Sequence, residues 1–156
     1  MIDTSRIPEE LQELPQWVGW RLAHREGKPT KVPMRPDGTG AASAIDPATW
    51  GTIDQALAAA RRYKYSGVGF VFTPEDPYTG IDLDKCRNPE TGELADWAAE
   101  IVRQFPDAYV EASPSGTGVH IITCGVAPHN GKQPYQGGAV EMYDRARYFT
   151  VSGVAL

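Results

Sequence analysis

Two aspartates stand two residues apart in GIDLDKC (80–86), a segment that is otherwise typical of a buried strand. Side chains alternate across a strand, so Asp82 and Asp84 point to one side while Ile81 and Leu83 point to the other. Carboxylates this close repel each other and lose hydration, and a divalent cation between them offsets both costs. The pair therefore predicts a site for Mg²⁺, which binds carboxylate oxygens and keeps room for phosphates. The alternative is a strand end whose acids are simply solvated.

A third acid follows the same alternation in AVEMYD, where Glu141 stands between Val140 and Met142. It is a further candidate metal ligand, and the alternative is a surface acid on an edge strand. An EF-hand loop starting at Asp82 is excluded, because Arg87 stands where that loop needs glycine and a strand precedes it.

The segment SPSGTGVHI joins two expected strands through a turn rich in glycine and hydroxyl groups. Such a turn can direct backbone N–H groups and hydroxyls at an anion. His120 follows at the start of the next strand, where its ring can donate to a phosphate. The alternatives are an ordinary hairpin connection and a histidine satisfied within the core.

The chain resembles the archaeo-eukaryotic primase superfamily, above all the primase-polymerase domains of phages and plasmids. Three motifs carry the resemblance in this order: the D-x-D pair, S-G-x-G-x-H, and an acid on a strand before RYFTVSG. QWVGWRL, GKPTKVP and DPATW resemble the N-terminal segment of those domains, so the resemblance covers nearly the whole chain. It implies template-directed joining of nucleotides by a DNA primase and polymerase, in the cytoplasm of a bacterial host. The implied partners are nucleoside triphosphates, a DNA template and primer, and a helical priming region and helicase that follow in a longer protein.

The resemblance also implies roles for particular residues. Asp82, Asp84 and Glu141 would hold two Mg²⁺ or Mn²⁺ ions, although many relatives have aspartate at the third position. Ser115 and His120 would bind the triphosphate of the incoming nucleotide. Apart from the resemblance, the same turn offers Ser113, Gly116, Thr117 and Gly118, and the charge of the triphosphate favours Arg147, with Arg145 as a second choice. Lys28 and Lys31 would meet template DNA or triphosphate. They belong to a basic stretch, 17–35, which has five Lys or Arg residues and one acid, and for which the alternative is a solvated hairpin.

The elements that position these residues indicate an α+β protein with a mainly antiparallel sheet and helices packed on it. Helices are expected after Thr52, which begins a capping box with Gln55, and over 94–105, where apolar residues recur at helical spacing. The expected strands are 16–24, 29–34, 67–73, 78–84, 108–113, 118–124, 139–144 and 147–153. By resemblance, 1–66 form a small α/β module and 67–156 an RNA-recognition-like βαββαβ core.

Composition limits the remaining classes. The chain has 156 residues, which predicts about one domain, and a net charge of −5, which argues against coating DNA by charge alone. No apolar run approaches the roughly 20 residues of a membrane span, and no signal peptide is recognised. Two cysteines are too few for a disulfide framework or a cysteine-rich zinc site, and we expect both to be reduced thiols.

Two other functions compete with a nucleotidyltransferase. A rolling-circle nuclease would need two histidines around one apolar residue, and the chain has no His-x-His. A nucleic-acid-binding module without chemistry would expose aromatic residues on its sheet, where this chain places acids.

Overall fold

The computed structural model describes residues 2–127, 131–136 and 138–156. The described helices are α1 (Glu9–Gln12), the 3₁₀ helix η1 (Pro47–Thr49), α2 (Ile53–Arg62) and α3 (Asp96–Arg103). The described strands are β1 (Trp17–Arg25), β2 (Lys28–Met34), β3 (Gly67–Phe72), β4 (Tyr78–Asp84), β5 (Tyr109–Ala112), β6 (Val119–Cys124), β7 (Gly131–Tyr135), β8 (Gly138–Tyr143) and β9 (Arg147–Val151). The predicted α+β class is confirmed, and the pairings β1–β2, β1–β3, β4–β6, β4–β8, β5–β6 and β7–β8 are all antiparallel.

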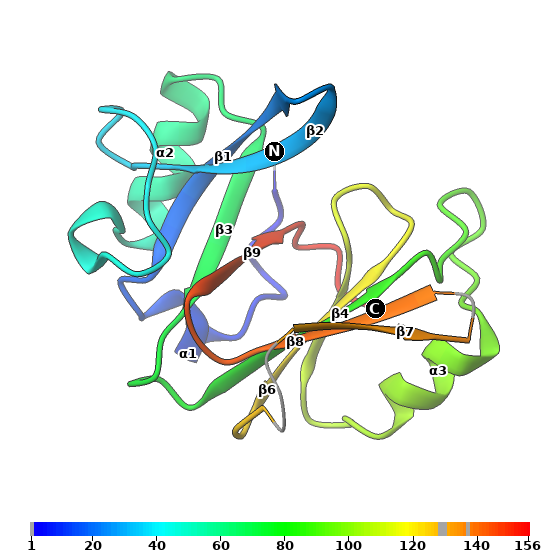
Figure 1. Ribbon diagram of the computed structural model, residues 1–156. Coiled ribbons are helices and arrows are strands. Elements are labelled where there is room, and N and C mark those ends of the chain that lie inside the picture. Colours follow the sequence, from blue (N-terminus) through cyan, green and yellow to red (C-terminus); the bar gives the residue numbers. More distant parts are fainter. Residues whose placement is uncertain (1, 128–130, 137) are drawn as a thin grey trace. The chain divides into compact units, whose positions relative to one another are not determined.

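The chain forms two compact units, each with its own sheet (Figure 1). We call one the hairpin unit, made of Pro8–Val71 and Ala146–Val151, and the other the carboxylate unit, made of Met1–Ile7, Phe72–Arg145 and Ser152–Leu156. These units differ from the predicted modules, because 67–71 and Ala146–Val151 belong with the N-terminal strands.

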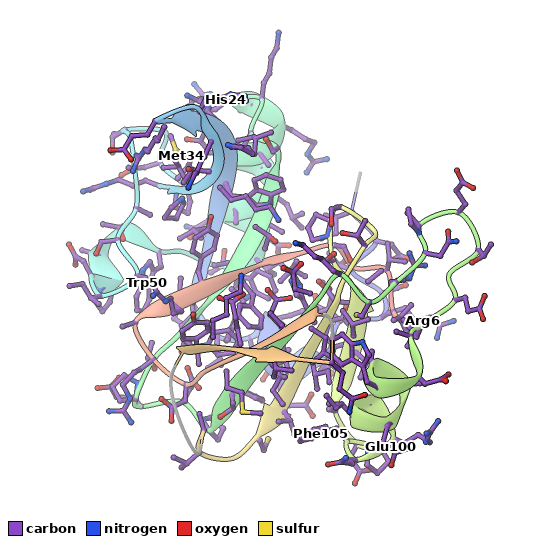
Figure 2. The ribbon with its side chains drawn as sticks, turned by 45° about the vertical axis from the view of Figure 1, so that its right-hand side comes forward. Arg6, His24, Met34, Trp50, Glu100 and Phe105 are labelled. Atoms are coloured by element: carbon purple, nitrogen blue, oxygen red, sulfur yellow. The ribbon has the colours of Figure 1, made fainter. Side chains whose placement is uncertain are left out.

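The hairpin unit contains a four-stranded sheet in the order β2-β1-β3-β9. Its first two strands are joined by Glu26 and Gly27, whose φ values of 52° and 74° allow a tight turn. Helix α2 begins with the predicted capping box, in which Thr52 and Gln55 bond each other's backbone N–H groups. It packs against the sheet through Ala59, which lies with Met34 in a small apolar cluster. In Figure 2, Met34 and His24 mark the β1–β2 hairpin.

The carboxylate unit contains a five-stranded sheet in the order β5-β6-β4-β8-β7. One face of this sheet packs on α3, and the buried residues of this core are Ile81, Leu83, Cys86, Ala98, Val119, Ile121 and Val140. Phe105, just after α3, packs on the same core, whereas Glu100 on the helix is exposed (Figure 2). The apolar spacing that predicted this helix therefore marks the side that covers the sheet.

Strands β3 and β4 follow each other in the chain but lie in different sheets. A βαββαβ core needs a second helix before its last strand, and between β6 and β8 the described residues instead form β7. This strand pairs with β8 and was not predicted, because GKQPY lacks an alternation of apolar and polar residues.

None of the helices in the described part of the chain is long and apolar enough to cross a membrane.

Candidate active site

A row of ionisable residues crosses the five-stranded sheet, with one residue on every strand. The strand register pairs Glu111 with His120, His120 with Asp82, Asp82 with Glu141, and Glu141 with Lys132. Partners in antiparallel strands place their side chains on the same face, so all five belong to one face of the sheet. It is the face opposite α3, because Ile81 and Leu83, the neighbours of Asp82, lie in the α3 core.

This row brings together three of the segments that the sequence singled out. Asp82 and Glu141 lie directly opposite each other, and His120 is on the other side of Asp82 with its Nε2 3.6 Å from Asp82 Oδ1. Asp84 is two residues further along β4 and therefore on the same face.

The electrostatics of Asp82 are unfavourable for its ionised form. Burial raises the pKa of the Asp82 carboxyl to about 6, and the negative charge of Glu141, a hydrogen bond with Glu141 and the charge of Asp84 act in the same direction. His120 opposes them by favouring the ionised form. The pKa values of clustered carboxyls rise because each new negative charge must be held close to the others with little water. A site of this kind favours a cation.

The carboxyls are not arranged around a common point. Across the described residues, no three His, Cys, Asp or Glu side chains are placed to hold a metal ion. Instead Asp82 and Glu141 share a hydrogen bond, and the hydroxyl of Tyr143 donates to Glu141 Oε1 at 3.0 Å. A proton between two carboxyls relieves the same repulsion that a cation would, so this arrangement fits a site that exchanges protons for metal ions.

The turn between β5 and β6 carries a chain of hydroxyl groups. Ser113 Oγ lies 3.1 Å from Ser115 Oγ, which lies 2.8 Å from Thr117 Oγ1. The turn is closed by hydrogen bonds between its two ends, since Ser113 N donates to Gly118 O and Gly118 N donates to Ser113 Oγ. Ser115 and Thr117 are exposed, and the rigid turn can present their hydroxyls to an anion.

Arg87 supports this turn, and the sequence analysis missed its role. Its backbone N–H donates to Thr117 O at 3.0 Å, and its Nη1 donates to Gly116 O at 2.9 Å. Its Nε is buried and has no hydrogen-bond partner among the described residues. The guanidinium therefore brings a positive charge to the predicted phosphate-binding turn. A basic residue three positions after Asp84 was the only signal for this in the sequence.

Glu111 and Lys132, at the two ends of the row, were also missed. Glu111 stands between Val110 and Ala112 in a strand that was predicted, but nothing local to AYVEAS reveals its partners. Lys132 lies on β7, which was not predicted. Only the register of the finished sheet aligns these two residues with the carboxylates.

The remaining basic residues predicted for the site do not stand on the strands of the row. Arg147, Lys28 and Lys31 belong to the hairpin unit. Arg145 belongs to the carboxylate unit, where its Nε lies 3.0 Å from Asp144 Oδ1. Lys28 and Lys31 also lie on opposite faces of the hairpin, since their register partners are Arg25 and Leu22, which alternate along β1.

No family model matches the chain. Among curated proteins it is similar to one named DNA primase-polymerase, from Nitratiruptor phage NrS-1, with 36% identity over 146 residues. The chain resembles part of a phage primase-polymerase. The aligned region is 92% of this chain and 20% of the relative, so the chain spans about a fifth of the relative's length.

Proposed function

We propose that this chain is the catalytic domain of a DNA primase-polymerase, which joins nucleotides on a DNA template. The observation that carries the proposal is the pairing of Asp82 with both Glu141 and His120, from three segments that are distant in sequence, on one face of one sheet. The similarity to a phage DNA primase-polymerase over most of this chain supports it. A priming region and a helicase in a longer protein are proposed partners.

In the proposed mechanism, Asp82, Asp84 and Glu141 would hold two Mg²⁺ or Mn²⁺ ions. Bound there, the ions would supply activation of a 3′-hydroxyl and charge stabilisation of a leaving pyrophosphate. His120 donates from its ring to a phosphate oxygen of the incoming nucleotide. The turn 113–118 offers its hydroxyls and backbone to the same triphosphate, and Arg87 adds a positive charge beside it. Each group must be in place before the nucleotide binds, which the sheet register and the closed turn provide.

Extension of a labelled primer on a single-stranded template tests this proposal. We expect extension by the wild type with Mg²⁺ or Mn²⁺, and a loss of at least about a thousandfold in Asp82→Ala/Asp84→Ala, because positioned metal ions supply several kcal/mol of transition-state stabilisation. Each deoxy- and ribonucleotide is supplied separately to show which sugar is used. The exposed Asp107 provides a control, since Asp107→Ala removes a carboxylate away from the row. Equal extension by the double variant and the wild type would reject the metal assignment.

The hairpin is the proposed contact for template DNA. Arg25 and Lys28 are direct cross-strand partners, and Arg21 lies on the same face. Like charges directly opposite each other destabilise a sheet, so a polyanion on this face would relieve them. Lys31 lies on the other face, with its Nζ 5.7 Å from the ring centroid of Trp20.

We therefore expect Lys28→Ala to weaken binding of single-stranded DNA and Lys31→Ala to serve as its matched control. A lost phosphate contact lowers the slope of log K against log [salt] by about 0.7 for single strands. Fluorescence anisotropy with a labelled oligonucleotide at several salt concentrations measures this slope. The same slope in Lys28→Ala as in the wild type would contradict the assignment of this face.

A further inference from the structure

Glu111 is a carboxylate with no exposed surface, at one end of the row. A buried carboxylate is tolerated where several donors surround it. Oε1 accepts from the Tyr109 hydroxyl at 2.8 Å and from the Gly153 N–H at 3.1 Å. Oε2 accepts from the Ser152 N–H at 2.9 Å and lies 3.1 Å from His120 Nδ1. Three donors besides His120 therefore fix the position of Glu111.

His120 lies between this fixed carboxylate and Asp82. Its Nδ1 faces Glu111 Oε2, and its Nε2 lies 3.6 Å from Asp82 Oδ1. A ring nitrogen that faces a carboxylate carries a proton, so Nδ1 donates to Glu111, and for Nε2 to donate to a phosphate as well the ring must carry its second proton. The same contact fixes the rotation of the ring, so Nε2 points along the row toward the carboxyls and away from β5.

If Glu111 had only a structural role, it would need to accept hydrogen bonds only from the backbone N–H groups of Ser152 and Gly153. Those two amides need acceptors, but they do not account for the contact of Oε2 with His120. That contact joins two register partners on neighbouring strands. Carboxylates that hold the far nitrogen of a functional histidine commonly set its orientation and basicity.

We propose that Glu111 is a positioning residue for nucleotide binding: it holds His120 with Nδ1 protonated and Nε2 directed at the phosphate of the incoming nucleotide. That Nε2 faces a nucleotide phosphate rests on the proposed function. That Nδ1 of His120 is protonated rests on the contacts of Glu111. The two are therefore tested by different measurements.

The state of the ring is measured from the ¹⁵N and ¹H signals of the imidazoles in ¹⁵N-labelled protein. The chain has three histidines, and His120→Gln identifies the signal of His120. We expect Nδ1 of His120 to be protonated in the wild type and its signals to move in Glu111→Gln, because an amide offers one acceptor oxygen where the carboxylate offers two. Tyr109→Phe is the matched control, since it removes a donor from Oε1 and leaves Oε2 in place. An unprotonated Nδ1 in the wild type would overturn the proposal, even if Glu111→Gln failed to fold.

The role in binding is measured as the dissociation constant of a nucleoside triphosphate with Mn²⁺, which does not require the protein to extend primers. We expect Glu111→Gln to weaken binding roughly 10- to 100-fold, as is typical for residues that support a binding group. In a His120→Ala background the same change should have no further effect, because Glu111 acts through the ring. An equal loss in both backgrounds would show a structural role and overturn the proposal. Failure of the wild type to extend primers would instead count against the proposed function.

Discussion

Asp82→Asn is expected to raise the melting temperature of the metal-free protein at pH 7.5 and, at the same pH, to abolish metal-dependent nucleotide incorporation. The pKa of the Asp82 carboxyl is raised to about 6, above all by burial. At pH 7.5 the folded protein therefore holds an ionised carboxylate that is less favourable there than in the unfolded chain. Asparagine has nearly the same shape without the charge, so it removes the repulsion from Glu141 and Asp84.

The sign of the pH dependence follows from proton binding. Between about pH 4 and 6 the folded protein keeps a proton on Asp82 that the unfolded chain has lost, so the free energy of unfolding falls as the pH rises. This contribution is fully present below about pH 4 and is lost above pH 6. A raised pKa of this size corresponds to about 3 kcal/mol in the free energy of unfolding between these pH limits. Thermal unfolding is measured from pH 4 to 8 in the presence of a chelator. The melting temperature of Asp82→Asn should be above that of the wild type at pH 7.5 and close to it at pH 4.

With metal ions present, the wild type should have a higher melting temperature than Asp82→Asn. Mn²⁺ is expected to raise the melting temperature of the wild type at pH 7.5, and to raise it less at pH 5, where protons compete for Asp82. It should have little effect on Asp82→Asn. Asp107→Asn is the control, because it makes the same chemical change at an exposed position. Equal stabilisation of Asp82→Asn and the wild type by Mn²⁺ would place the metal elsewhere.

The parts of the fold that were predicted correctly are those encoded over short distances. The alternation in GIDLD predicts β4 and places Asp82 and Asp84 on one face, and the pattern Thr52-x-x-Gln55 predicts the start of α2. Both depend on contacts among neighbouring residues. The order of strands in a sheet does not, and the separation of β3 from β4 could not be deduced from the turn between them.

The candidate site was predicted only where a residue's own neighbours made it unusual. Asp82, Glu141 and His120 interrupt apolar strands, and the turn 113–118 has a distinctive composition. Glu111 also interrupts a strand, but its partners Ser152 and Gly153 lie about forty residues further along the chain. Arg87 acts on a turn 29 residues away. Residues that support a site through distant partners become recognisable only when the fold is known.

Gly118→Ala is expected to have the second large effect, because this glycine lies where β6 begins beside β4. A Cβ on Gly118 would lie 2.7 Å from Leu83 O and 3.3 Å from Ser113 Oγ. The first of these is a backbone atom between Asp82 and Asp84, so it cannot move without moving the carboxylates. The start of β6 must shift instead, and with it the turn 113–118 and His120.

We expect Gly118→Ala to lower stability by about 1–3 kcal/mol, the usual cost of overpacking, and to lower nucleotide incorporation at least about tenfold at a temperature where the protein is folded. Gly40→Ala separates the two effects. A Cβ there would meet nothing within 4 Å, but its φ of 134° is strained for alanine, so this variant should lose stability and keep activity. Melting temperatures and primer extension, measured side by side, compare them. Loss of stability without loss of incorporation in Gly118→Ala would mean that the turn and His120 do not act on the nucleotide.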